Sequence, residues 1–380
     1  MGSRLGRGPG GLSGPAVYAD HSAGMRALGR DQLEPLTSLR FVAALLVFVY
    51  HAPLVQPFAH DHALGQAGVG FFFLLSGFIL TYTYGGALNS HAAVARFYVA
   101  RFARVYPAYL MSIAVALPVV ALYGSLAWDK SASAIRAEAL AAQLLAVQAW
   151  LPREEIYLGI NSPAWSISVE AFFYAIFPLL IGSLWRSFAT TGARAVFVVA
   201  ALTWACAAAV FAIPHHADVW TTYIFPPVRL VDFVVGMLLG IAFLRGYRLP
   251  GSATAWELAA VAAVAGAILA IPHAPAGLQY SLLAMPCWAA LIAAVALRRG
   301  AVSRLLSHRA FVRLGEMSYA FYLVHLSVLI VAEHVIAPAY VAAVALAVSL
   351  AAAWLLHAGV ERPLRTFIRG RAAPRAVAAA

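Results

Sequence analysis

The sequence predicts an all-α fold: a polytopic membrane bundle of about ten transmembrane helices, with both ends of the chain in the cytoplasm. Three observations lead to this fold class: the composition, the length of the apolar stretches and the distribution of the basic residues. Of the 380 residues, 63% are hydrophobic and only 11% are charged, whereas soluble domains are about 45–50% apolar and about 25% charged. The mean hydropathy is +0.82. This composition excludes an ordinary soluble domain and an intrinsically disordered chain.

Ten stretches are apolar and long enough to cross a bilayer, which takes roughly 20 mostly apolar residues. These stretches are 36–57, 65–84, 105–125, 164–185, 194–213, 223–244, 255–272, 279–297, 314–336 and 339–358. A further apolar stretch, 135–151, is short and carries charged residues, so we interpret it as a buried or interfacial helix. The remaining segments predict a flexible tail at 1–32, a membrane domain at 33–365 and a second tail at 366–380.

The basic residues indicate the orientation of the bundle. When the N-terminus is placed in the cytoplasm and the sides alternate, 22 of the 26 Lys and Arg residues fall on the cytoplasmic side. They lie in the segments 1–40, 96–104, 186–194, 245–248, 298–313 and 362–375. The positive-inside rule predicts such a bias. The net charge of +11 therefore indicates orientation, and we predict no nucleic-acid partner.

Ionisable residues inside membrane spans are costly, so each is a candidate for function. Arg40 and His51 lie on the first span, with ten residues between them. This spacing places them on one helical face, about 16 Å apart along the axis. Histidine titrates near neutral pH and can act as a general base. The alternative for His51 is a core histidine bonded to a neighbouring helix.

The fourth predicted span enters the membrane from the outside and carries Glu170 at about the depth predicted for His51. A carboxylate at this depth needs a partner, and we expect it to orient the imidazole and to stabilise its cation. A structural pair with Arg229 is the alternative, although Asp232 competes for that arginine at i,i+3 spacing.

Other spans and loops carry weaker signals. Arg101 and Arg104 lie on one helical face at the cytoplasmic surface, and arginine forks bind phosphates. From charge alone, attraction to anionic lipid is the favoured interpretation of this pair. In the second span, Gly77 permits close helix approach and Ser76 can hydrogen-bond across helices. The four histidines of the outer loops have no persuasive metal-ligand spacing, and we predict no metal site. They are His60, His62, His215 and His216.

These polar groups form a path across the membrane, with guanidinium groups at the cytoplasmic side and a His and a Glu nearer the outside. Such a path suits an enzyme that takes a group from an anionic cytoplasmic donor to an acceptor in or beyond the outer leaflet. It also suits a proton-coupled transporter or exporter of a sugar, lipid or acyl compound, in which His and Glu relay protons. Composition and spacing do not separate the two classes.

Six ordered motifs do separate them. They are LTSLRFVAALLVFVYHAP at 36–53, GVGFFFLLSGFIL at 68–80, RFARVYPAYL at 101–110, PAWSISVEAFFYAIFPLL at 163–180, LGEMSYAFYLVHLSVLI at 314–330 and ERPLR at 361–365. In this order they resemble the integral-membrane acyltransferase family 3, the O-acyltransferases that modify bacterial surface glycans and some antibiotics. The resemblance runs from about Pro35 to Arg365.

The resemblance implies transfer of an acyl group, often acetyl, from acyl-CoA to a hydroxyl, with no bound cofactor. His51 looks like the catalytic histidine of the family, acting as a general base or as a transient acyl carrier. Arg40 resembles a family arginine needed for activity, with a role in donor binding or site assembly. Arg101 and Arg104 look like the cytoplasmic arginines that would hold the CoA phosphates.

Glu170 matches the central motif of the family, and we expect it to act together with His51. Several further polar or aromatic residues are candidates to bind the acceptor or to stabilise the oxyanion. They are Ser76, Asn161, Trp165, Ser166, Tyr174, Arg229 and His325. The residues themselves do not rank these candidates.

The acceptor stays open among a polysaccharide, a lipid-linked sugar, a peptidoglycan precursor and a small glycosylated metabolite. The resemblance places the protein in the cytoplasmic (inner) membrane of a bacterium. Family members often carry an appended extracytoplasmic SGNH-type domain, whereas this sequence has a short tail after its last predicted span. We therefore expect that acylation of a distant polymer would need a separate extracytoplasmic partner.

Overall fold

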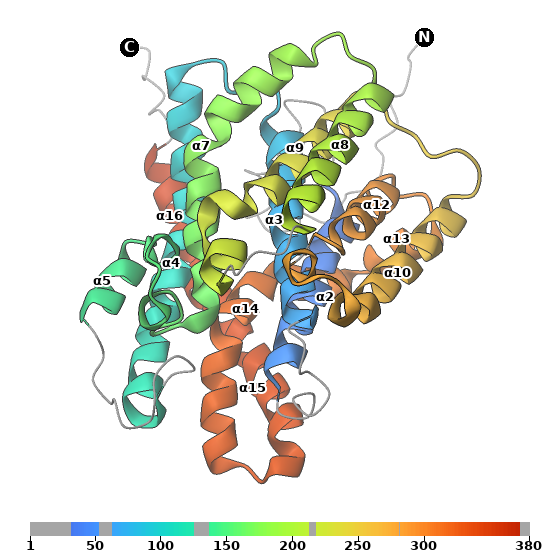
Figure 1. Ribbon diagram of the computed structural model, residues 1–380. Helices are drawn as coiled ribbons and strands as arrows, with labels where there is room; N and C mark the ends of the chain where they lie inside the picture. Colours follow the sequence, from blue (N-terminus) through green and yellow to red (C-terminus); the bar gives the residue numbers. More distant parts are fainter. Residues whose placement is uncertain (1–31, 53–62, 125–136, 213–217, 281, 373–380) are drawn as a thin grey trace, which may run out of the picture. The chain divides into compact units, whose positions relative to one another are not determined.

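The computed structural model describes residues 32–52, 63–124, 137–212, 218–280 and 282–372 (Figure 1). Within these ranges the chain is almost entirely helical and contains no β-strand, which confirms the predicted all-α class. Leu33–Ala380 form one compact unit, to which all of the described helices belong.

Ten helices correspond to the ten predicted spans. They are α2 (Glu34–His51), α3 (Ala63–Tyr84), α4 (His91–Tyr123), α7 (Trp165–Ser187), α8 (Ala193–Ala212), α9 (Leu230–Leu244), α10 (Ala253–Ala270), α12 (Met285–Ala296), α14 (Arg309–Val335) and α15 (Val341–Leu356). Among the described residues, 8 helices are long and apolar enough to cross a membrane. The two predicted spans outside this group are α2, which has 18 residues and carries Glu34 and Arg40, and α12, which has 12 residues.

Short helical turns connect the long helices. They are α5 (Ala137–Leu144), η2 (Gln148–Trp150), α6 (Glu154–Tyr157), η3 (Ser162–Ala164), η4 (Trp220–Ile224), η5 (Pro226–Arg229), η6 (Ile271–His273), α11 (Ala276–Gln279), α13 (Ala301–Leu306), η7 (Pro338–Tyr340) and η8 (His357–Glu361). The stretch predicted as a buried or interfacial helix is thus α5 followed by η2. At 8 residues, α5 is too short to span a bilayer, and it buries Ala139, Ala142 and Gln143.

Two helix boundaries differ from the predictions in a way that matters for the site. Helix α4 begins at His91, with the Ser90 side chain accepting from the Ala93 N–H at 3.2 Å. Arg101 and Arg104, which precede the predicted span 105–125, therefore lie inside the same long helix as that span. At the other end of the chain, α16 (Arg362–Ala372) continues from η8, so residues 366–372 of the predicted tail are helical. Hydropathy identifies only the apolar part of a helix, whereas α4 and α16 extend through segments that are rich in arginine.

The helices that carry the polar motifs pack against one another. Helix α2 contacts α3 and α14, α14 contacts α4 and α15, and α3 contacts α9 (Figure 1). The contact between α3 and α9 is close because each helix presents a glycine to the backbone of the other. A Cβ at Gly77 would lie 2.0 Å from the carbonyl oxygen of Phe233, and one at Gly236 would lie 2.0 Å from that of Leu74. The structure thus confirms close approach at Gly77.

A buried carboxylate supports the start of α13. Glu257 of α10 is fully buried and accepts from the backbone N–H groups of Gly300 at 3.1 Å, Val302 at 2.8 Å and Ser303 at 3.1 Å. Anions are favoured at helix N-termini because unpaired N–H groups point at them. This carboxylate therefore ties α10 to α13.

We expect Glu257→Ala to lower the free energy of unfolding by about 3 kcal/mol, because three backbone donors would lose a buried, charged acceptor. Thermal unfolding of the purified protein in detergent measures this as a fall in Tm. Glu154→Ala is the control, since Glu154 is exposed. Equal Tm values for the two variants would contradict the prediction.

Candidate active site

Two histidines from different helices meet in the bundle. His51, the last residue of α2, places its Nδ1 atom 3.1 Å from Nε2 of His325 in α14, and the ring centroids lie 5.1 Å apart. His325 is fully buried and His51 is half-buried. We call His51 and His325 the histidine pair. His325 was a candidate from sequence for the acceptor pocket, and its contact with His51 was not predicted.

Backbone carbonyl groups favour one tautomer for each member of the histidine pair. Nδ1 of His51 lies 2.9 Å from the Val47 oxygen, and Nδ1 of His325 lies 2.7 Å from the Tyr322 oxygen. A carbonyl oxygen only accepts hydrogen bonds, so these contacts favour the tautomers in which both Nδ1 atoms carry a proton. In a neutral His325 the lone pair then lies on Nε2, where it faces the Nδ1–H of His51. In this tautomer the lone pair of His51 lies on Nε2, which makes Nε2 the basic atom of His51.

Glu170 has different neighbours from those predicted. The Tyr174 hydroxyl donates a hydrogen bond to the Glu170 carboxylate one turn further along α7, and the carboxylate acts electrostatically on Arg40 and Arg101. The sequence predicts Glu170 as the partner of His51, whereas the partner in the structure is His325. The reason is depth: Glu170 lies one helical turn beyond Ser166, on the side of the arginines.

The predicted alternative partner of Glu170, Arg229, is also occupied elsewhere. Arg229 Nη2 lies 2.6 Å from Asp232 Oδ2, and Arg229 Nη1 donates to the Tyr280 oxygen at 2.7 Å. Its guanidinium also lies over the rings of Phe73 and Tyr223. Arg229 and Asp232 are 2% and 1% exposed. Arg229 and Asp232 thus form a buried ion pair, and the bond to the Tyr280 oxygen ties η5 and α9 to the segment that follows α11.

Four arginines from three helices gather in one region, and we call them the arginine cluster. They are Arg40 of α2, Arg101 and Arg104 of α4, and Arg365 of α16. Arg40, Arg101 and Arg365 all act electrostatically on Arg104. Arg101 also donates from Nη2 to the Tyr84 hydroxyl at 3.4 Å.

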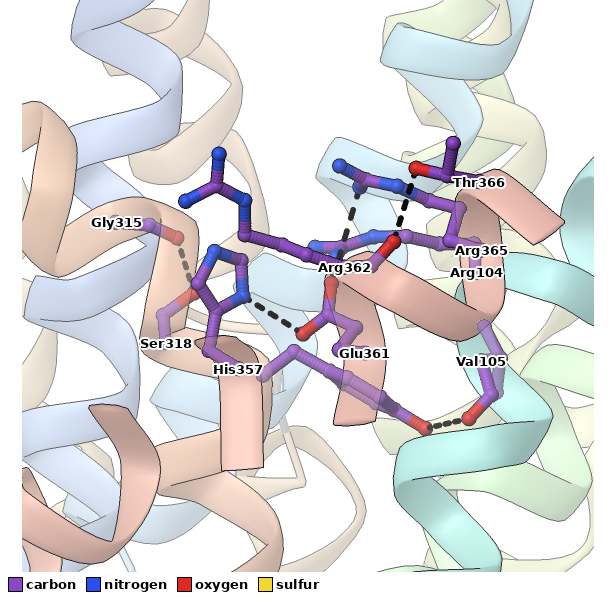
Figure 2. A network of polar contacts seen from close by, with 10 residues as sticks. Arg104, Val105, Gly315, Ser318, His357, Glu361, Arg362, Arg365 and Thr366 are labelled. Carbon is purple, nitrogen blue, oxygen red and sulfur yellow. Dashed lines mark hydrogen bonds and ion pairs between the residues drawn. The ribbon is translucent and has the colours of Figure 1, made fainter. Parts of the chain in front are cut away.

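Glu361 is the carboxylate around which part of the arginine cluster is arranged. Figure 2 shows the side chains of Arg104, His357 and Arg365 converging on it. Glu361 is fully buried and forms ion pairs with Arg104 and Arg365, the latter at 3.8 Å, while His357 Nδ1 lies 3.0 Å from Oε2. His357 and Glu361 bound the π-helical turn η8, and such turns frequently occur at functional sites.

Sequence reasoning identified the ERPLR motif but gave no role to Glu361 or Arg365. The available signal was an acidic residue among arginines at the end of an apolar stretch. Its meaning depends on Arg104, which lies on a distant part of the chain and reaches the same carboxylate only through the packing of α4 against η8 and α16.

Two of the predicted acceptor or oxyanion residues are bound to neighbouring helices. Asn161 donates from Nδ2 to the Ser112 hydroxyl and to the Leu323 oxygen, both at 3.0 Å. The Ser166 hydroxyl lies 2.9 Å from the Tyr322 hydroxyl. Both residues are buried. These bonds fix the chain around η3 against α4 and α14, one turn from His325.

The other candidates are spread along the bundle. Trp165 packs edge-on against Phe73 and Tyr223, with ring centroid distances of 6.1 Å and 4.9 Å. Tyr174 lies with Glu170 in the arginine region, and Ser76 is half-buried on α3. Their roles toward the acceptor stay predictions. The four outer-loop histidines fall outside the described residues.

The arginine cluster and the histidine pair are connected by shared helices. On α14, the Tyr319 ring lies beside Arg104 and its hydroxyl donates to the Val105 oxygen at 3.0 Å, while His325 follows six residues later. Six residues of α-helix span about 9 Å, and the eleven-residue step from Arg40 to His51 on α2 spans about 16 Å. The site therefore has a cationic part and an imidazole part on common, rigid helices.

Comparison with known proteins agrees with the motifs. The model of the acyltransferase domain of family 3 matches residues 36–358. Acyltransferase MdmB of Streptomyces mycarofaciens is 32% identical over 91% of this chain and 95% of its own length. The exopolysaccharide production protein ExoZ of Rhizobium meliloti (strain 1021) is 28% identical over 73% of this chain and 80% of its own length. Nodulation protein 10 of Rhizobium leguminosarum bv. viciae is 30% identical over 44% of this chain and 49% of its own length.

No solved structure matches the chain. The family match covers most of the chain and includes α2, α4, α7 and α14, which carry most of the site. It decides between the two function classes that composition left open, in favour of an enzyme over a transporter. The chain belongs to the acyltransferase family 3 and is a multi-pass membrane acyltransferase.

Proposed function

We propose that this acyltransferase moves an acyl group, in the first instance acetyl, from acyl-CoA to a hydroxyl of a glycan or glycosylated compound. His51 acts as the general base. The observation that carries the proposal is the connection of a cation-rich region to a basic imidazole by α2 and α14. A donor with a phosphate-bearing head and a long, flexible arm ending in a thioester has this distribution of charge and reactivity.

The arginine cluster supports the donor. Four guanidinium groups face three carboxylates, Glu170, Glu316 and Glu361, so the region keeps a positive excess. Arginine binds phosphate oxygens bidentately and stays charged when buried. We propose that Arg40, Arg101 and Arg104 bind the CoA phosphates, with Arg365 added by the structure, and that this end of the bundle faces the cytoplasm. Glu170 and Tyr174 then hold Arg40 and Arg101 in place.

The chemistry proceeds by one proton transfer in each direction. His51 Nε2 takes the proton of the acceptor hydroxyl as its oxygen attacks the thioester carbonyl. The tetrahedral intermediate expels the CoA thiolate, which takes the proton back from the His51 imidazolium, so that an ester and a free thiol leave. In the variant with two half-reactions, His51 Nε2 itself attacks the thioester and transfers the acyl group from an acyl-histidine.

The names of the relatives support a glycan as the acceptor. ExoZ is named for exopolysaccharide production, and a surface glycan is an acceptor that meets a membrane enzyme at the outer leaflet. We propose a bacterial cytoplasmic (inner) membrane location, with a separate extracytoplasmic partner where the acceptor is a distant polymer. Asn161, Trp165, Ser166 and Ser76 are the proposed acceptor-side or oxyanion residues.

Thiol release tests this function. Purified protein in lipid nanodiscs is given a panel of acyl-CoA donors, with and without candidate glycans and glycosylated metabolites, and free CoA is measured with a thiol reagent. We expect acceptor-dependent CoA release, together with a mass increase of the acceptor equal to the acyl group. If no donor yields CoA with any acceptor, while the mass of surface glycans and secreted metabolites is the same in wild-type and deletion cells, the proposal is wrong.

For donor binding, we expect Arg101→Gln to raise the KM for acetyl-CoA by about tenfold, the loss of one charge-assisted interaction. The KM for acetyl-pantetheine, which lacks the phosphates, should change little. Arg96→Gln is the matched control, because Arg96 lies on the same helix and is exposed. Equal effects on both donors, or an unchanged KM for acetyl-CoA, would contradict phosphate binding by Arg101 and favour its contact with anionic lipid.

A further inference from the structure

We propose that His325 is a positioning residue, which holds the His51 imidazole in the tautomer and orientation needed for proton transfer and stabilises the cation that forms. This inference rests on the proposed role of His51 as the base. It assigns His325 to the reacting imidazole and not to the acceptor pocket.

The geometry orients His51 from two sides. Its Nδ1–H faces the Val47 oxygen at 2.9 Å and His325 Nε2 at 3.1 Å. His325 is itself fixed, because its Nδ1–H is bound to the Tyr322 oxygen and its ring is stacked on Phe321 at a centroid distance of 6.1 Å. A base whose non-reacting nitrogen is held by an oriented acceptor keeps its lone pair on the other nitrogen.

Two tyrosine rings of the described residues lie beside the histidine pair. The Tyr50 ring lies 4.7 Å from the His51 ring, and the Tyr322 ring lies 5.9 Å from the His325 ring. The Tyr322 hydroxyl is bound to the Pro163 oxygen at 2.8 Å. The carboxylate of Glu170 interacts with Tyr174 and the arginine region. The imidazole of His325 thus offers His51 Nδ1 an oriented side-chain acceptor that carries no charge in its neutral form.

A neutral acceptor suits the membrane interior. When His51 takes a proton on Nε2, its Nδ1–H becomes a donor from a cation, and hydrogen bonds of this kind are about twice as strong as neutral ones. The lone pair of His325 Nε2 accepts this bond while the proton stays on His51. A carboxylate in the same place would add a buried charge in every resting enzyme, and such charges are costly inside a bilayer.

Core packing is the competing explanation of His325, and the two explanations make different predictions for isosteric variants. Phenylalanine fills a similar volume and stacks on the same rings, but it has no acceptor. Glutamine is less well matched in shape, but its amide oxygen can accept from the His51 Nδ1–H. A packing role therefore favours the Phe variant, and a positioning role favours the Gln variant.

The kinetic test compares wild type, His325→Phe and His325→Gln in nanodiscs by acceptor-dependent CoA release. We expect His325→Phe to lower kcat about 100-fold or more, as loss of an orienting partner does in a catalytic triad, with the KM for acetyl-CoA within about twofold. His325→Gln should stay within about tenfold of wild type in kcat. The acidic limb of the kcat/KM profile should move to lower pH in His325→Phe, because the His51 imidazolium has lost an acceptor. A near-normal kcat and an unmoved limb in His325→Phe would overturn the proposal.

A second measurement needs neither of the His325 variants. In wild-type protein labelled with ¹⁵N-histidine, the signals absent from the spectrum of His51→Gln belong to His51, and their chemical shifts report which nitrogen is protonated. We expect the Nδ1–H form at neutral pH. An Nε2–H form would overturn the inference.

The outcomes also separate this inference from the proposed function. If the wild type transfers acyl groups and His51→Gln does not, while His325→Phe is as active as wild type, the function stands and the role of His325 is wrong. If His51→Gln is as active as wild type, the general-base mechanism itself is wrong.

Discussion

His51→Gln is expected to lower kcat by about 10²–10⁴-fold, the range that a positioned general base contributes. Glutamine can keep hydrogen bonds to the Val47 oxygen and to His325, but its amide takes up no proton near neutral pH. The loss should therefore fall on kcat, with little change in the KM for the acyl-CoA. Steady-state CoA release and acyl transfer to the acceptor measure both parameters.

The control for this variant is His334→Gln. His334 lies on α14, and its Nδ1 bonds the Ile330 oxygen at 2.7 Å, but its side chain is exposed at the helix end. It should keep normal turnover. If both variants transfer acyl groups at near wild-type rates, His51 is a core histidine, which is the alternative that its position on the sequence leaves open.

A single-turnover experiment separates the two versions of the mechanism. With acetyl-CoA labelled in the acyl group and no acceptor, an acyl-histidine pathway gives a burst of CoA equal to the enzyme and leaves label on the protein. The label should then be absent in His51→Gln. A direct attack by the acceptor hydroxyl gives neither burst nor label.

Gly236→Ala is expected to destabilise the bundle by about 3 kcal/mol, at the upper end of the range for an overpacked site. The added Cβ would lie 2.0 Å from the Leu74 oxygen, which is backbone and cannot move aside as a side chain can. Helices α3 and α9 would have to separate. Since α3 also packs on α2, the strain should reach the helix that ends at His51. A fall in Tm in detergent and a loss of monodisperse protein on gel filtration would report it.

Gly266→Ala is the matched control, because Gly266 lies inside the predicted span α10 and a Cβ there meets no atom within 4 Å. We expect this variant to change the free energy of unfolding by less than about 1 kcal/mol, and alanine is the better helix former. Similar Tm values for Gly236→Ala and Gly266→Ala would show that the contact between α3 and α9 adjusts without cost.

Hydropathy and helical periodicity predict much of this molecule. The ten apolar stretches correspond to ten helices, and the short stretch 135–151 is not a span. Arg40 and His51 share α2, so the spacing in the sequence carries over to the structure. The helix ends were predicted less well: α4 begins in a segment where charge and apolar residues alternate, and hydropathy does not recognise such a segment as helix.

The position of Glu170 relative to His51 depends on how deeply α2 and α7 lie in the membrane relative to each other, which neither helix shows alone. Counting residues from the outer surface placed this carboxylate near His51, on the assumption that α2 and α7 enter the membrane at the same level. In the structure, the Ser166 hydroxyl is already level with Tyr322, so Glu170, one turn further, lies with Tyr174 and the arginines. A relative shift of two helices by one or two turns changes every partner while leaving each hydropathy profile the same.

The sequence by itself determined the class of the protein, the identity of its helices and the residues proposed to carry its chemistry, because apolar length and ordered motifs are properties of continuous segments. Tertiary structure alone decided the partners: His325 for His51, across 274 residues, and Glu361 for Arg104. The physical reason is that helices in a bilayer are apolar on nearly all sides. Their rotation and depth are set by close packing at residues such as Gly77 and Gly236 and by a few buried polar bonds, which no single helix reveals.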